Sequence, residues 1–368
     1  MMNIASKDFK IISHFCLPSY RQHLFSIAAI FTILLLTYSN SFDCSWHFDD
    51  IPNIVQNVNI HVSALSWDHI KKISLGLRQD SISRPVAYLS FAVNYYFGGL
   101  NVFGYHIVNF LIHYLSSIFL FLFVFNTLKL PLFKEKYQNY AYSIALLSTI
   151  LWAVHPIHVT SVTYIVQRMA SMAGLFYIMS MYFYLKFRTT PSSSKYASAF
   201  ACVVFGLLAL GTKENSAMLP ISIFLYDLFL IQGLTWSNVK RNIFLCLIAM
   251  IIVIGYAFIF SDISSIFSIS GYKHRPFTMI ERLLTEPRVI LFYISLLLYP
   301  LSSRFALIHD FDISKSIFDP WTTVLSFTAI AFIVFVSLAK SKKWPLFAFC
   351  VIFFFINHFI EGSFIPLE

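Results

Sequence analysis

Two adjacent carboxylates, Asp49 and Asp50, are the residues of this sequence best suited to general-base chemistry. They lie in the string WHFDDIPN at residues 46–53, directly after a long apolar stretch. Neighbouring carboxylates at a bilayer edge repel each other and are partly desolvated, which raises the pKa of one member of such a pair and suits proton abstraction. The alternative is a solvated acidic loop in which Asp50 caps a turn that begins at Pro52.

Basic side chains recur near the same face and could hold a phosphate. Arg84 precedes Pro85, Arg168 lies within an apolar segment, and Lys213 stands beside Glu214. An arginine at the centre of a membrane helix costs ~2.5 to 3.5 kcal/mol, so Arg168 should face a cavity or a partner. The loop 261–288 is also rich in basic residues, which predicts an anionic partner such as a lipid phosphate, with a solvated loop as the alternative; it contains Lys273, His274, Arg275, Arg282 and Arg288.

Histidines form two groups. His155 and His158 lie in the string HPIH. This spacing could bind a metal, but the indication is weak because no third ligand is nearby in the sequence. Capping of a helix end is the alternative. His106, Asn109 and His113 share one helix face by their spacing and should point into the bundle. For His113 the alternative is an interhelical hydrogen bond, whereas His106 lies nearer the outer surface. Glu361 adds a carboxylate near the C-terminal end of the sequence.

The composition requires elements that cross a membrane. Of the 368 residues, 58% are hydrophobic and only 12% are charged, and the mean hydropathy is +0.72. A soluble domain carries about a quarter charged residues, so soluble enzymes, disulfide scaffolds and disordered proteins are excluded. The net charge of +9 is carried by short loops between apolar segments, which favours a role in topology over nucleic-acid binding.

Ten apolar segments predict an all-α polytopic membrane protein with about nine to eleven transmembrane helices. They cover Leu24–Phe42, Val102–Phe125, Ala141–Val154, Val162–Phe187, Tyr196–Leu210, Ala217–Ile231, Ile243–Phe260, Val289–Leu301, Thr323–Ala339 and Pro345–Phe359. One set of loops is basic and is therefore predicted to be cytoplasmic; it contains Lys7, Lys10, Arg21, Lys129, Lys134, Lys136, Lys186, Arg188, Lys195, Lys240, Arg241, Lys340, Lys342 and Lys343.

The remaining loops are predicted to lie outside. Loop 43–84 should contain an amphipathic helix on the membrane surface, capped by Ser66, with Trp67, Ile70, Ile73 and Leu77 on one face. In the outer region 261–320, the short segment Val289–Leu301 is predicted to be re-entrant, which places Glu361 on the outer side. The whole chain, residues 1–368, is expected to be one membrane domain without a soluble domain.

Together these residues predict an outward-facing cavity with a carboxylate for proton abstraction and cations for a phosphate. This combination suits the transfer of a sugar from a lipid-linked phosphate to a hydroxyl. An ion or lipid transporter could use the same charges.

Eight strings, in order, resemble the membrane part of the transmembrane O-mannosyltransferases that carry tetratricopeptide repeats, especially their bacterial relatives. They are FDDIPNIVQN (48–57), RPV (84–86), GYHIVN (104–109), HPIH (155–158), QRMA (167–170), TKEN (212–215), LTEPR (284–288) and NHFIE (357–361). The resemblance covers almost the whole chain from about Phe42 onwards. Members of this family continue into a repeat domain, so the sequence is interpreted as a naturally short or a truncated form.

The resemblance implies a C-type glycosyltransferase fold that uses a polyprenyl-phosphate sugar at the non-cytoplasmic face, with inversion and no obligatory metal. Asp49 would serve as the base or orient the acceptor, with Asp50 as its neighbour, and Arg84, Arg168, Lys213 and Arg288 would hold the phosphate. The cavity would be lined by His106, His155, His158, Glu214 and Glu361.

The expected partners are a protein acceptor and, for acceptor recruitment, a repeat-containing partner; nucleic acid is not expected. A bacterial inner membrane is favoured over the endoplasmic reticulum. A non-catalytic polyprenyl-lipid flippase and a degenerate scaffold subunit remain as alternatives.

Overall fold

The computed structural model describes residues 19–76, 84–190, 194–260, 272, 275–306 and 309–363. Within these ranges every regular element is helical, which confirms the predicted all-α class. The chain forms two compact units, the first comprising Met1–His69 and Arg84–Ser216 and the second Ile70–Ser83 and Ala217–Glu368. The predicted residues Lys7, Lys10, Leu77, Lys273 and His274 lie outside the described residues.

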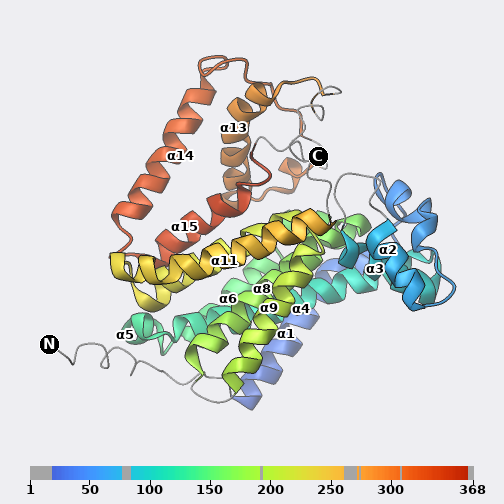
Figure 1. Ribbon diagram of the computed structural model, residues 1–368, viewed down its shortest axis with the longest axis horizontal. Helices are drawn as coiled ribbons and strands as arrows, with labels where there is room; N and C mark the ends of the chain where they lie inside the picture. Colours follow the sequence, from blue (N-terminus) through green and yellow to red (C-terminus); the bar gives the residue numbers. More distant parts are fainter. Residues whose placement is uncertain are drawn as a thin grey trace. The chain divides into compact units, whose positions relative to one another are not determined.

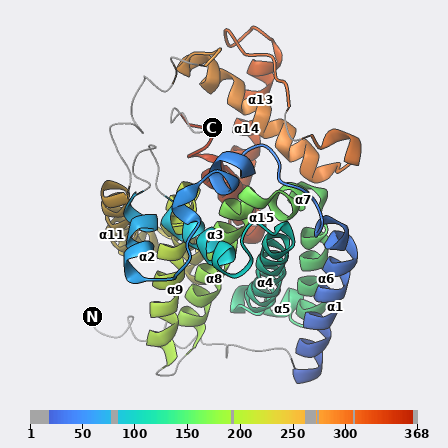
Figure 2. The same cartoon turned by 90° about the vertical axis from the view of Figure 1, so that its right-hand side faces the viewer.

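The first unit is a bundle in which α4 packs against α6 and α8, and α8 packs against α9 (Figures 1 and 2). A hydrogen bond of 2.8 Å from Ser180 Oγ to the carbonyl of Cys202 links α8 to α9. The helices of this unit are α1 (Tyr20–Tyr38), α3 (Pro85–Gly98), α4 (Val102–Leu128), α5 (Lys134–Tyr137), α6 (Ala141–Ala153), α7 (Val159–Thr163), α8 (Arg168–Thr189) and α9 (Ser194–Leu210).

The second unit contains α10 (Leu219–Tyr226), α11 (Trp236–Phe260), α13 (Met279–Leu298), α14 (Thr322–Ala339) and α15 (Pro345–His358). Within it α14 packs against both α13 and α15 (Figure 1). The helix α2 (Trp67–Gly76) and the short helix Glu214–Met218 each begin in the first unit and end in the second.

Five helices among the described residues are long and apolar enough to cross a membrane, and a sixth is obtained if a bent pair forms one span. They are Tyr20–Ser41, Val102–Leu128, Glu214–Gln232, Trp236–Tyr256 and Thr322–Ala339, with the bent pair Ala141–Ala153 and Pro156–Thr163. The other predicted segments also form helices, but α9 and α15 have only 17 and 14 residues. The chain is therefore a multi-pass integral membrane protein.

The lipid-facing nature of these helices is visible in their exposed side chains. On α11, Phe244 and Ile251 are 66% and 67% exposed. A soluble protein would bury such side chains, because their transfer out of water supplies the main driving force of folding. Lipid provides that apolar surrounding instead.

The bend between α6 and α7 arises at Pro156, which has no N–H to continue the helix. The carbonyl of Ala153 is satisfied from neighbouring helices: His113 Nε2 donates at 2.8 Å and Tyr38 Oη at 3.3 Å. This confirms the interhelical hydrogen bond considered for His113. After the break, the backbone reaches Arg168 through short helical pieces, with Tyr164 in an extended conformation between α7 and the turn Ile165–Gln167.

The amphipathic helix predicted in the first outer loop is α2. Ser66 caps it, since the backbone N–H of His69 donates to Ser66 Oγ at 3.3 Å. Trp67 is exposed, whereas Ile73 is buried. Its position on a membrane surface stays a prediction.

The apolar segment Val289–Leu301 begins inside a longer helix, and its re-entrant path stays a prediction. Residues 289–298 are the C-terminal part of α13, which begins at Met279 because Thr278 and Glu281 form a capping box. The N–H of Glu281 donates to Thr278 Oγ1 at 3.3 Å, and the N–H of Thr278 donates to Glu281 Oε2 at 2.8 Å. Polar capping residues therefore extend this helix beyond its apolar stretch.

Candidate active site

The two adjacent carboxylates have opposite environments. Asp50 is 1% exposed, and both of its oxygens accept backbone N–H groups: Oδ1 from Val166 at 2.7 Å and Oδ2 from His47 at 3.1 Å. Burial raises the pKa of Asp50, and these two hydrogen bonds oppose that effect. Asp50 therefore anchors the loop, while Asp49 is exposed.

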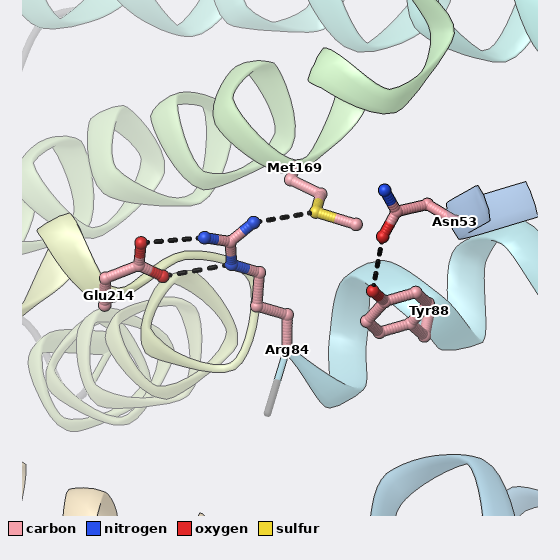
Figure 3. Close-up of polar contacts among 5 residues, drawn as sticks. All are labelled: Asn53, Arg84, Tyr88, Met169 and Glu214. Atoms are coloured by element: carbon pink, nitrogen blue, oxygen red, sulfur yellow. Dashed lines mark hydrogen bonds and ion pairs between the residues drawn. The ribbon is translucent and has the colours of Figure 1, made fainter. Parts of the chain in front are cut away.

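The backbone of Asp49 is held on both sides by side chains. Its N–H donates to Tyr164 Oη at 2.8 Å, and its carbonyl accepts from Asn53 Nδ2 at 2.9 Å. Asn53 is held in turn, because Tyr88 Oη donates to Asn53 Oδ1 at 2.7 Å (Figure 3). Phe48, directly before Asp49, is exposed and has a φ of 38°, in the left-handed region that bulky residues rarely adopt. The loop thus presents Asp49 in one fixed orientation.

Arg84 is engaged by Glu214 in a bidentate ion pair (Figure 3). Nη2 lies 2.8 Å from Oε1 and Nε lies 3.0 Å from Oε2, while Nη1 donates to the sulfur of Met169 at 3.2 Å. Both side chains keep about a fifth of their surface exposed, 24% for Arg84 and 18% for Glu214. Unlike a buried pair, this guanidinium can be reached from outside.

Arg84 and the loop that carries Asp49 are connected through α3. Arg84 immediately precedes that helix and Tyr88 lies on its first turn, so the partner of Asn53 follows Arg84 by four residues. Lys213 is half-buried in the turn that also supplies Glu214, and the N–H of Val86 donates to the carbonyl of Gly211 at 2.8 Å. The predicted residues Asp49, Arg84, Lys213 and Glu214 therefore belong to one unit and to connected segments.

Arg168 does not have the open position expected of a phosphate ligand. It is completely buried, and its guanidinium donates to Asn109 Oδ1 at 2.7 Å, to Asn94 Oδ1 at 2.9 Å and to the carbonyl of Tyr105 at 3.0 Å. All these acceptors are neutral. The predicted phosphate contact disagrees with this geometry, because protein encloses the guanidinium. Arg168 instead ties the start of α8 to α3 and α4.

The three histidines predicted to line the cavity make contacts within the protein. His106 is 1% exposed and its Nε2 donates to the carbonyl of Cys44 at 3.0 Å. His155 Nδ1 accepts the N–H of Ile157 at 3.2 Å, which confirms the helix-capping alternative. The His158 ring centroid lies 4.4 Å from that of Trp152. Within the described ranges no group of three His, Cys, Asp or Glu residues is placed to hold a metal ion.

The remaining predicted residues belong to the second unit. Arg288 donates to the carbonyl of Asp312 at 2.6 Å and to Ser314 Oγ at 3.2 Å, so it fixes a loop against α13. Glu361 is exposed, and its carbonyl accepts from Arg282 at 2.6 Å. Arg282 also pairs with Glu286 at 3.4 Å. Convergence of Arg288 and Glu361 with Asp49 stays a prediction.

Sequence reasoning assigned no role to Tyr88, Tyr164 or Asn53. Asn53 lies inside the quoted acidic string, and each tyrosine is four residues from a singled-out arginine. A search for hydrogen-bonding side chains at this distance from Arg84 and Arg168 could have found both tyrosines.

Curated proteins similar to this chain are protein O-mannosyl-transferases, which confirms the resemblance seen in the motifs. TMTC4 of Homo sapiens is 29% identical over 197 residues, which is 50% of this chain and 26% of that protein. TMTC4 of Mus musculus is 31% identical over 54% of this chain and 28% of its own length. TMTC3 of Mus musculus is 26% identical over 57% of this chain and 22% of its own length.

The matched region thus spans about a quarter of each of these relatives. No protein-family model matches the sequence, and no solved structure matches it.

Proposed function

We propose that the chain is a membrane glycosyltransferase that moves a hexose from a polyprenyl-phosphate carrier to a protein hydroxyl. The names of its relatives favour mannose as the sugar and a protein as the acceptor. The observation that carries the proposal is the exposed Asp49 carboxylate, fixed in a loop that is connected through Asn53 and Tyr88 to Arg84. A C-type glycosyltransferase bundle is part of the proposal.

The chemistry is a single displacement. The acceptor oxygen attacks the anomeric carbon, the bond from that carbon to the phosphate oxygen breaks, and the hydroxyl proton passes to Asp49. Attack opposite the leaving group inverts the anomeric centre. No covalent sugar–enzyme intermediate is needed, so one accessible carboxylate suffices.

Arg84 is the proposed phosphate ligand. The donor is a phosphodiester, and the departing phosphate gains negative charge as the bond breaks, so a nearby guanidinium stabilises the transition state more than the ground state. Glu214 already balances the charge of Arg84, and a bound phosphate therefore competes with Glu214 or recruits Lys213, which lies next to it in sequence. No metal or other cofactor is required by this scheme.

The proposed location is the non-cytoplasmic face of a bacterial inner membrane. This part rests on the basic loops assigned to the cytoplasm and on the resemblance of the motifs to bacterial relatives. A repeat-containing partner is the proposed means of recruiting the protein acceptor.

The test is transfer of mannose from a short-chain polyprenyl-phosphate mannose by the purified chain in detergent or vesicles. Asp49→Asn should lower turnover by about 100-fold or more, the range for loss of a general base, with an unchanged unfolding midpoint. Asp50→Asn is the matched control: it should lower stability by ~1 to 3 kcal/mol, because its amide nitrogen cannot accept a backbone N–H.

Full activity of Asp49→Asn would refute the proposal. Movement of intact lipid-linked sugar across vesicles, unaffected by Asp49→Asn, would identify a flippase instead.

A further inference from the structure

A single short segment holds both carboxylates of the candidate site. Tyr164 accepts the N–H of Asp49 at 2.8 Å, and two residues later the N–H of Val166 donates to Asp50 at 2.7 Å. The segment lies between α7 and α8, where Tyr164 is extended between the end of α7 and the short turn Ile165–Gln167. The position of Asp49 therefore depends on a part of the chain more than a hundred residues away.

The Tyr164 hydroxyl has a hydrogen left to donate. In the bond to Asp49 N–H the phenolic oxygen is the acceptor, and a phenol can donate and accept at once. Burial and the neighbouring carboxylates of Asp49 and Asp50 raise the pKa of Tyr164 to about 12, so the phenol keeps that hydrogen. The hydroxyl thus lies at the backbone of Asp49 with one hydrogen available to a carboxylate.

Tyr164 itself is held by burial and by hydrogen bonds to the backbone on either side of it. It is 8% exposed, and Ile165 next to it is completely buried. Asn109 of α4 donates to the carbonyls of Val162 and Ile165, at 3.4 and 3.3 Å, on either side of Tyr164. The Oδ1 of the same Asn109 accepts from Arg168, so the buried arginine stabilises the segment that carries the tyrosine.

We propose that Tyr164 is the positioning residue for Asp49. This inference rests on the proposed function. Its hydroxyl donates to one oxygen of the Asp49 carboxylate, which leaves the other oxygen to receive the proton of the acceptor hydroxyl. Tyr164 keeps its own proton throughout, and the departing phosphate takes the electron pair of the broken bond.

The experiment compares Tyr164→Phe with Tyr114→Phe in the mannose-transfer assay. The control also loses one tyrosine hydrogen bond, from Tyr114 Oη to the carbonyl of Ile27 at 3.2 Å between α4 and α1, at a place without a catalytic role. Tyr164→Phe should lower kcat by about 10-fold to 100-fold and leave the donor KM within about twofold, because misplaced catalytic groups lose rate rather than ground-state binding. Tyr114→Phe should keep the wild-type kcat.

A double variant separates positioning from a direct role. In the Asp49→Asn background, Tyr164→Phe should cause no further loss, because the residue it positions is already disabled. An additional loss of the same size would mean that Tyr164 acts on substrate by itself, which would overturn the positioning role. An unchanged kcat in Tyr164→Phe alone would also overturn it.

Different results would refute the proposed function and the proposed role of Tyr164. Absence of transfer by the wild type, or full activity of Asp49→Asn, refutes the function, whereas an inactive Asp49→Asn with a fully active Tyr164→Phe refutes only the role of Tyr164. If Tyr164→Phe does not fold, 3-fluorotyrosine at position 164 keeps the shape and makes the hydroxyl more acidic. The inference then requires an altered kcat at an unchanged donor KM, and an unaltered kcat contradicts it.

Discussion

At the scale of single residues, burial separates side chains that are chemically alike. Asp49 and Asp50 are identical and adjacent, yet only Asp49 is exposed, because two backbone N–H groups hold Asp50 in the interior. Arg84 and Arg168 differ in the same way: the first is accessible and paired with a carboxylate, the second is enclosed among neutral acceptors. The accessible member of each pair is the one suited to chemistry.

Arg168→Ala is expected to lower the free energy of unfolding by about 3 kcal/mol or more. It removes a large side chain from a closed site and leaves the buried amides of Asn94 and Asn109 without their donor. Arg84→Ala is the contrasting variant, since its site is partly exposed, and it should raise the donor KM with little loss of stability. Thermal unfolding in detergent and donor titration measure both effects; a stable Arg168→Ala with a raised donor KM would restore the phosphate role to Arg168.

At the scale of elements, the residues that surround Asp49 lie at the ends of helices. Pro85 starts α3 directly after Arg84, and the chain bends by 52° between Ala153 and Pro156 before it reaches Tyr164 through the short helix α7. The polar side chains of the site thus lie at the points where helices begin or break. There the backbone leaves N–H and carbonyl groups for side chains to bond.

The element α2 is expected to lie on the membrane surface through Trp67. This side chain is 77% exposed, which is unfavourable in water for a large indole and favourable at the interface of a bilayer. The difference between the fluorescence spectra of the wild type and Trp67→Phe reports Trp67 alone. In vesicles this difference spectrum should be blue-shifted, and brominated lipids should quench it. A difference spectrum quenched by aqueous iodide but not by brominated lipid would contradict this position.

At the scale of the whole molecule, the distribution of charge sets the expected orientation. The exposed Lys342 belongs to a basic loop and Ser45 to the loop that carries Asp49, so the two should face opposite sides of the membrane. In a variant with its five native cysteines replaced, Ser45→Cys in intact bacterial cells should react with an impermeant maleimide. Lys342→Cys should react only after the membrane is opened. Equal labelling of both in intact cells would refute the topology.

The sequence was sufficient for the apolar helices, because lipid forces each spanning segment to satisfy its own backbone by hydrogen bonds along ~20 residues. It was less reliable for α13, where a capping box of two polar residues sets the start of the helix outside the apolar stretch. The acidic string, Arg84 and the pair Lys213-Glu214 were also found from sequence. Their residue types and neighbours carry the signal.

What only the tertiary structure decided is which of these groups is accessible and what holds it. The contacts that hold these groups join residues 59 to 130 positions apart in the sequence: Arg168 with Asn109, Tyr164 with Asp49, and Arg84 with Glu214. No local pattern encodes such contacts, because they depend on how α3, α4 and α8 pack. The sequence by itself determined a helical membrane protein with an acidic loop, since hydropathy is a local property, whereas solvent access is a property of the packed bundle.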